Sequence, residues 1–140
     1  MWFKGVRGYK LPDLIEERQE WHTETRYVIT AGEMGSVQLA LYNGNKPTYL
    51  RNKAYVYNLW VNKSFRKEGM GAKLLKRAEE IAQRHGYRYI NLDWSPYDSK
   101  QWTCDWYVRQ GYNGTQMLDG TIQFIKELEI KIANIDDIIE

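Results

Sequence analysis

The feature that most constrains this chain is an apolar segment that leads through a glycine-containing loop into an amphipathic helix. Ala54–Val61 (AYVYNLWV) is a nearly continuous apolar and aromatic run, which predicts a central strand covered on both faces. Gly69 and Gly71 follow it. From Gly71 onward, apolar residues recur at three- and four-residue spacing, at Leu74, Leu75, Ala78, Ile81 and Ala82. His85 followed by Gly86 is a typical helix end, so the helix is predicted to stop there.

Shorter segments on either side complete the predicted fold. Strands are expected at residues 26–30, 37–42, 87–94, 112–118 and 121–128. A second helix is expected between Asp98 and Gly111, because Asp98 and Gln101 resemble a capping box. Residues 11–22 predict a short N-terminal helix, since Pro12 suits a first helical position and apolar residues recur on one side.

This order of elements predicts the fold class. A strand, helix and strand in succession imply a parallel strand pair with a right-handed crossover, whereas the hairpins on either side imply antiparallel pairing. The predicted class is α/β of the α+β type, with a largely antiparallel sheet, a central parallel pair and flanking helices. A chain of 140 residues with 43% apolar residues is expected to bury one core, as a single domain over residues 1–140.

Charge and cysteine usage exclude several classes of protein. A net charge of +2 offers no concentrated basic face, so no nucleic-acid partner is expected. Cys104 is the one cysteine and cannot form an internal disulfide, which favours a reducing, cytoplasmic location. No apolar run is long enough for a signal peptide or a membrane span, so no membrane association is expected.

The loop before the long helix has the properties of an anion site. The first amides of a helix have no intrahelical partner, and the helix dipole places partial positive charge there. Glycines at 69 and 71 allow close approach of a phosphate, and Arg66 and Lys67 add cationic charge. A dinucleotide fingerprint would require a third glycine where Leu74 stands, and a P-loop would require Gly-Lys-Ser/Thr. A tight strand-to-helix turn without a ligand is the alternative interpretation.

The wider context resembles a known family. Leu59-Trp60-Val61, followed after four residues by Arg66-x-x-Gly69-x-Gly71 and an amphipathic helix, resembles the acetyl-CoA motif of the GNAT superfamily of N-acetyltransferases. Residues 106–112 (WYVRQGY) are similar to the second signature of that family. The resemblance covers residues 54–112 and implies a GNAT-like fold.

The resemblance also implies roles for individual residues. The co-substrate would be acetyl-CoA, the acceptor a primary amine, and no metal ion would be required. Tyr107 would be the general acid that protonates the leaving thiolate. Backbone groups of three strand residues, Leu59, Trp60 and Val61, would pair with the pantetheine arm. The pyrophosphate would be held by the amides of Arg66, Lys67, Glu68, Gly69, Met70, Gly71 and Ala72.

The general base is less well defined by the sequence. A carboxylate or a water chain usually removes the proton of the ammonium, but the predicted strand Ala54–Val61 has no carboxylate. Asp93, near the end of the next strand, is the candidate base. Tyr57 or Asn58 could instead orient a water molecule. An acyl-enzyme on Cys104 is not expected, because no histidine lies nearby in the sequence.

The N-terminal half departs from the family pattern. Residues 2–6 leave room for only a short first strand, and one short helix precedes residue 26 where the family has two. A second subunit completing this side would make a homodimer. The alternative function is a non-catalytic acyl-CoA-binding or interaction module that retained the fold. If Trp60, Trp94 and Trp102 lie near the acceptor, they would favour an amine with apolar or aromatic neighbours.

Overall fold

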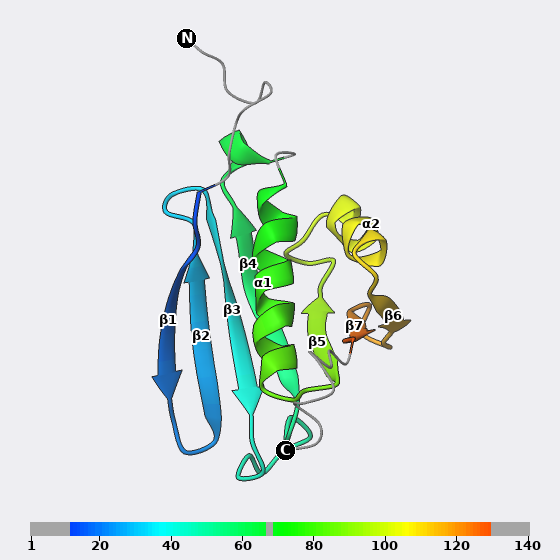
Figure 1. Cartoon of the computed structure of the whole chain (residues 1–140). Coiled ribbons are helices and arrows are strands. Elements are labelled where there is room, and N and C mark those ends of the chain that lie inside the picture. Colours follow the sequence, from blue (N-terminus) through cyan, green and yellow to red (C-terminus); the bar gives the residue numbers. More distant parts are fainter. Residues whose placement is uncertain (1–11, 67–68, 130–140) are drawn as a thin grey trace.

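The computed structural model describes residues 12–66 and 69–129, which form a seven-stranded sheet with helices against it (Figure 1). Along the chain the elements are β1 (Ile15–Glu20), β2 (Glu24–Thr30), β3 (Gly35–Tyr42), β4 (Ala54–Val61), the 3₁₀ turn η1 (Lys63–Phe65), α1 (Met70–Arg84), β5 (Tyr89–Trp94), α2 (Gln101–Arg109), β6 (Asn113–Gln116) and β7 (Ile122–Glu127). The strand order is β1-β2-β3-β4-β5-β7-β6. Every neighbouring pair is antiparallel except β4 and β5, which are parallel, and this confirms the predicted class.

Helix α1 forms where the apolar spacing predicted it. Its N-cap is Gly69, whose φ of 83° lies in the left-handed region that glycine adopts without strain. The predicted apolar stripe is buried against β3 and β4. His85 is the C-cap, and Gly86, with a φ of 88°, ends the helix as expected.

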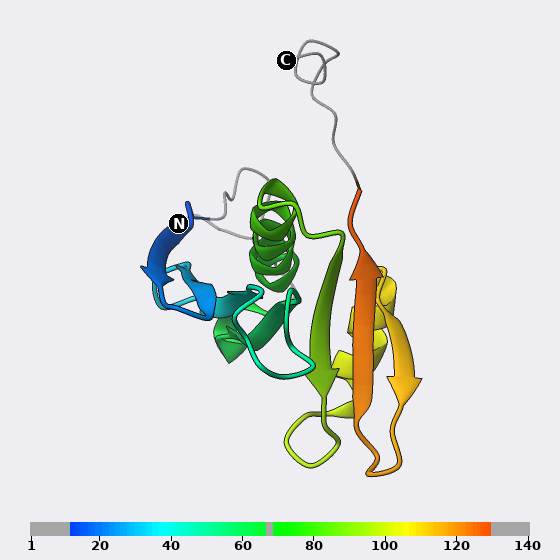
Figure 2. The ribbon, with the colours of Figure 1, turned by 90° about the horizontal axis from the view of Figure 1, so that it is seen from below.

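Both helices contact the same face of the sheet. On β7, Lys126 pairs with Glu79 of α1, while the Phe124 ring lies 5.6 Å from the Tyr107 ring of α2. Residues two apart on a strand share a face, so α1 and α2 cover one side together. No helix of the described ranges covers the other side, which we call the free face. Helix α1 runs alongside the strands in Figure 1, and the view from below in Figure 2 looks nearly along its axis.

Because of this one-sided arrangement, the prediction that β4 is covered on both faces is wrong. Ala54 and Val56 point toward α1 and are buried. The alternate residues Tyr55 and Tyr57 are only partly buried, and Trp60 is 50% exposed. The apolar character of the strand therefore reflects aromatic side chains on the free face.

The predicted N-terminal helix is also wrong. Residues Ile15–Glu20 form the edge strand β1, which pairs antiparallel with β2 from Ile15↔Thr30 to Glu20↔Thr25. A tight turn joins the two strands, with the Trp21 amide donating to the Glu24 carbonyl at 2.8 Å. Pairing with β2 outweighs the weak helical periodicity, because each cross-strand hydrogen bond is gained only in the sheet. The predicted strand at residues 2–6 lies outside the described residues.

The second helix is shorter than predicted and is capped differently. Helix α2 begins at Gln101 with Lys100 as N-cap, and no side chain caps its first amides. The predicted capping box is therefore wrong: the Asp98 carboxylate instead accepts a hydrogen bond from the Ser99 hydroxyl at 3.4 Å. Thr103 anchors the first turn, since its hydroxyl donates to the Lys100 carbonyl and accepts from the Trp94 indole.

Candidate functional site

The centre of the sheet contains a parallel pair that separates almost at once. Only Ala54↔Ile90 and Tyr55↔Asn91 are in register between β4 and β5 in the described chain. Beyond them, both strands continue toward their carboxyl ends, to Val61 and Trp94. The facing backbone groups beyond Tyr55 are therefore not satisfied by strand pairing, and they are available to an extended ligand.

A β-bulge in β4 lies beside this separation. The register with β3 changes between Gln38↔Tyr57 and Ser36↔Trp60, so β4 has one extra residue there. Asn58 lies in this bulge and adopts the left-handed conformation, with a φ of 55°. The bulge turns Leu59 toward the helix side and Trp60 toward the free face. Sequence reasoning considered Asn58 only as a water-orienting residue, although asparagine is one of the few side chains that tolerates this conformation.

The N-terminus of α1 lies at the open end of the two strands. Gly69 makes no side-chain cap, so the first helical amides, those of Met70, Gly71 and Ala72, are not capped by a side chain. A Cβ at Gly71 would lie 3.4 Å from the Trp106 ring and 3.6 Å from the Val61 side chain. A longer side chain would therefore have to displace these neighbours.

Arg66 approaches the same end from the loop after η1. Its Nε donates to the Val61 carbonyl at 3.3 Å, and its guanidinium lies 5.9 Å from the centre of the Trp102 ring. Cationic charge is thus placed beside the uncapped helix start. Lys67 and Glu68, the other loop residues predicted to bind phosphate, lie outside the described residues.

Tyr107 lies on the helix side of the sheet in an aromatic cluster. Its ring contacts those of Trp106, Tyr112 and Phe124 at centroid distances of 5.2 to 6.1 Å. Burial in this cluster raises the pKa of Tyr107 to about 12, so its hydroxyl is protonated at neutral pH. A protonated phenol can donate a hydrogen bond or a proton.

Asp93 lies on the opposite side of β5. Its neighbours Leu92 and Trp94 are buried on the helix side, so the carboxylate projects from the free face. The Tyr55 hydroxyl donates to its Oδ1 at 3.3 Å. Burial raises the pKa of Asp93 and outweighs the effect of this hydrogen bond, which favours the carboxylate. The structure therefore does not bring Asp93 and Tyr107 into contact.

The sequence did not identify Tyr55 as part of this arrangement. Its partner Asp93 is 38 residues away, and neither residue belongs to a recognisable motif. The only sequence signal is the alternation that places Tyr55 and Tyr57 on one face of β4. The Tyr57 hydroxyl is buried and has no hydrogen-bond partner within the described residues, while the Arg26 guanidinium lies 4.9 Å from its ring centre.

The other predicted side chains are divided between the two sides. Trp60 and Trp102 are each 50% exposed, but Trp94 is buried on the helix side and does not face an acceptor on the free face. Cys104 is buried, and burial raises the pKa of its thiol, which disfavours the thiolate that an acyl-enzyme would need.

Within residues 12–66 and 69–129, no group of three or more histidine, cysteine, aspartate or glutamate side chains is arranged to hold a metal ion. In the same ranges, neither α-helix combines the length and apolar character of a bilayer-spanning segment. The predicted cytoplasmic location and single domain stay predictions.

Known proteins are similar to this chain in both sequence and fold. The model of the acetyltransferase (GNAT) family matches residues 3–112. An uncharacterized N-acetyltransferase of Methanocaldococcus jannaschii is 27% identical over 78 residues, which are 56% of this chain but only 34% of that protein. The chain thus spans about a third of this curated relative's length.

Solved structures share the fold at low identity. An acetyltransferase from Bacillus cereus has a TM-score of 0.55 and 22% identity, over 89% of this chain and 81% of that one. The PaiA N-acetyltransferase of Thermoplasma acidophilum, solved with coenzyme A, has a TM-score of 0.58 and 16% identity, over 75% of this chain and 61% of that one. With a family model that matches most of its length and the fold of these relatives, the chain belongs to the acetyltransferase (GNAT) family.

Proposed function

We propose that the protein is an acetyl-CoA-dependent N-acetyltransferase that transfers the acetyl group directly to a primary amine. The observation that carries this proposal is the separation of β4 and β5 after two registered pairs, next to the uncapped N-terminus of α1. An extended chain with a phosphate group at one end fits this combination: the strand edge offers backbone hydrogen bonds and the helix start offers amides.

The residues present fit coenzyme A at each part of this path. Leu59, Trp60 and Val61 lie on β4 beyond its last pair with β5, where their backbone would pair with the pantetheine arm. The segment from Arg66 to Ala72 would hold the pyrophosphate. Within it, glycine at 71 lets the start of α1 lie close to Trp106 and Val61, which already fill the space where a larger side chain would extend.

Two side chains would handle the protons of the reaction. Asp93 would take a proton from the ammonium, so that the neutral amine attacks the thioester carbonyl. As the C–S bond breaks, the electron pair leaves on sulfur, and the Tyr107 hydroxyl would donate its proton to the thiolate. The nitrogen, which is positively charged after the attack, would lose its extra proton to solvent as the amide forms, and solvent would return a proton to the Tyr107 phenolate. The raised pKa of Tyr107 keeps that proton available at neutral pH.

The positions of these groups on opposite faces are compatible with this scheme. The separation of β4 and β5 runs through the sheet, so a thioester lying in it would be reached from both sides. The amine would approach from the free face beside Asp93, and the thiolate would leave toward Tyr107. Acid and base therefore need not contact each other.

Binding and turnover distinguish this function from the alternative. Calorimetry with acetyl-CoA and CoA should give binding in the micromolar range, and a thiol-release assay over a panel of primary amines should give turnover. Absence of CoA binding would contradict both the enzyme and a non-catalytic acyl-CoA-binding module. Binding with no turnover on any amine would favour the module.

We also propose that two copies associate through the β1 side. All six residues of edge strand β1 are exposed, and Trp21, in the turn that follows, is 57% exposed. Light scattering coupled to size exclusion should give about twice the mass of one 16.7 kDa chain. A monomer mass at micromolar concentration would contradict this.

A further inference from the structure

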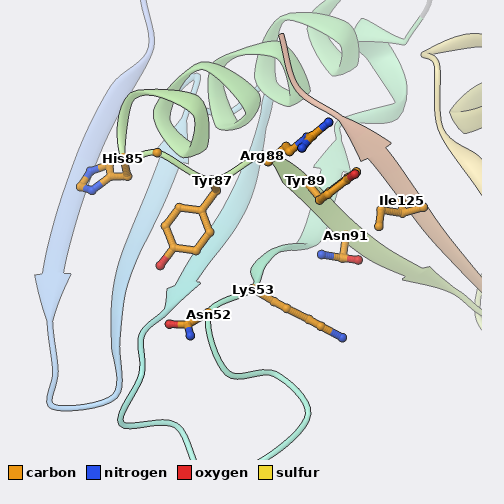
Figure 3. A pocket seen from close by; sticks show the side chains of 9 residues that line it. Asn52, Lys53, His85, Tyr87, Arg88, Tyr89, Asn91 and Ile125 are labelled. Carbon is orange, nitrogen blue, oxygen red and sulfur yellow. The ribbon is translucent and has the colours of Figure 1, made fainter. Parts of the chain in front are cut away.

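The closed end of the parallel pair borders a cavity that the proposed reaction does not use. It has a volume of about 490 Å³ and lies between the loop before β4, the loop between α1 and β5, and the first residues of β5 (Figure 3). The pairs Ala54↔Ile90 and Tyr55↔Asn91 separate it from the open end of the strands, where coenzyme A would enter. A ligand in the cavity would therefore be a different group from the phosphates of coenzyme A.

The charged side chains among the described residues that line the cavity are all basic. Lys53 and Arg88 line the cavity, and no aspartate or glutamate is among the described residues that line it. Arg88 is engaged, because its guanidinium pairs with Glu127 at 2.8 Å. The Lys53 ammonium makes no ion pair with any residue in the described ranges; it lies 5.4 Å from the ring centre of Tyr49. An uncompensated ammonium in a cavity without carboxylates attracts an anion.

The remaining lining adds polar and flat apolar surface. Asn52 lies beside Lys53, and Figure 3 shows Lys53 extending below Asn91 of β5. The Asn91 amide nitrogen already donates to the Ala54 carbonyl at 3.1 Å, which holds this wall in place. The ring of Tyr89 is 43% exposed and can carry a flat apolar group.

The cavity lies on the same face of the sheet as Asp93. Tyr89, Asn91 and Asp93 are alternate residues of β5, so their side chains follow one another along the free face. Four residues of a strand span about 13 Å, which is the separation expected between the levels of Tyr89 and Asp93. A molecule that is bound at Asp93 and reaches along β5 would enter the cavity.

We propose that this cavity is a second binding site, for an organic anion whose carboxylate or phosphate pairs with Lys53 and whose flat or apolar part lies on Tyr89. The anion has one of two sources. It is either the far end of the acceptor, in which case the site rests on the proposed function, or a separate small molecule.

The first experiment tests the site itself. Phenyl phosphate is titrated into protein saturated with CoA, so that the phosphate site at α1 is filled. It should bind, and phenol should bind at least tenfold more weakly. Lys53→Met should weaken phenyl phosphate binding about tenfold, the loss of one charge-assisted contact. Lys76→Met on the exposed face of α1 removes the same charge elsewhere and should have no effect. Equal affinity in Lys53→Met and the wild type overturns the site.

The second experiment identifies the source of the anion. Tetraglycine and its C-terminal amide have the same amine, but only tetraglycine has a carboxylate, about 13 Å away when extended. If the acceptor supplies the anion, Lys53→Met should raise KM about tenfold for tetraglycine and leave KM for the amide unchanged. If the anion is a separate ligand, both KM values stay unchanged while phenyl phosphate binding still depends on Lys53. If the wild type does not bind CoA, or turns over none of the amines, the proposed function is contradicted. The first experiment tests the anion site independently of that result.

Discussion

The two halves of the sheet differ in how completely their backbone is paired. Strands β1, β2 and β3 form continuous antiparallel ladders. The β1–β2 ladder begins at Ile15↔Thr30, and the β2–β3 ladder ends at Thr30↔Ser36. The half that contains β4 and β5 has a bulge, a parallel pair of two registered positions and a helix without a side-chain cap. An extended ligand needs unpaired backbone groups and open space, so the half that is poorer in internal hydrogen bonds is the one that we propose to bind coenzyme A. The ladders of the other half serve as a scaffold.

Among the variants that test this difference between the two halves, the largest change in CoA affinity is expected at the start of α1. Gly71→Glu places bulk against Trp106 and adds a negative charge to the segment that we propose to hold the pyrophosphate. We expect a loss of CoA affinity of at least a hundredfold, about 3 kcal/mol, measured by calorimetry. Gly44→Glu in the turn after β3 makes the same charge change where a Cβ would meet only the Asn52 side chain, at 3.8 Å, and it should bind CoA normally. Unchanged affinity in Gly71→Glu would remove the assignment of the phosphate site.

Tyr107→Phe tests whether Tyr107, beside the proposed coenzyme A site, is the general acid of the reaction. Removing the hydroxyl leaves the aromatic cluster intact, so affinity for CoA should remain while kcat falls about a hundredfold, the usual range for a lost general acid. Tyr97→Phe, at a tyrosine that is 83% exposed, is the matched control. A normal rate for Tyr107→Phe would make Tyr107 a packing residue only.

Asn58→Val tests the bulge. A β-branched residue is strained at the φ of 55° found here. The variant should lose about 1–2 kcal/mol of unfolding free energy and bind CoA more weakly. Asn58→Gly should retain both properties, because glycine accepts this conformation. Thermal unfolding and calorimetry on the two variants measure the difference; equal stability of the valine variant would argue against a strained bulge.

Tyr55→Phe separates the base from its partner on the free face. The Tyr55 hydrogen bond favours the Asp93 carboxylate, so its removal should raise the pKa of Asp93 further. Since the base must be deprotonated, the acidic limb of the kcat/KM profile should move to higher pH, with less than a tenfold change in rate at the optimum. An acidic limb that does not move would show that Asp93 is not the base.

The smallest effect is expected in the scaffold half. Arg77 of α1 donates to Glu16 of β1, and this hydrogen bond lowers the pKa of Glu16. A carboxyl whose pKa is lowered by folding stabilises the protein above its ordinary pKa, and this contribution is lost as the pH falls through the folded pKa.

Glu16→Gln should therefore cost about 0.5 kcal/mol at pH 7 in urea unfolding, as for a partly exposed ion pair. The difference from the wild type should shrink as the pH falls below the ordinary pKa of 4.5. CoA affinity should be unchanged; a large loss of affinity would contradict the division of the molecule into scaffold and site.

The elements that could be predicted from the sequence are those whose signals lie within a few neighbouring residues. Helix α1, its glycines and its end were predicted because spacing and capping chemistry lie within adjacent turns. Strand β1 was mistaken for a helix, because its weak periodicity gave no sign of the partner that it pairs with in β2. The capping role of Asp98 failed similarly, since Trp94 and Thr103 anchor that helix start through a contact across the fold.

The sequence by itself determined the family and the sheet class, and it led to the proposal that the loop from Arg66 to Ala72 holds phosphate. These rest on residue types whose backbone preferences act locally. Only the tertiary structure decided that Tyr107 and Asp93 lie on opposite faces, that Tyr55 reaches Asp93, and that Lys53 lines a cavity on the same face. The physical reason is that side chains far apart in sequence meet only through strand register and the separation of β4 from β5, and no local pattern encodes either.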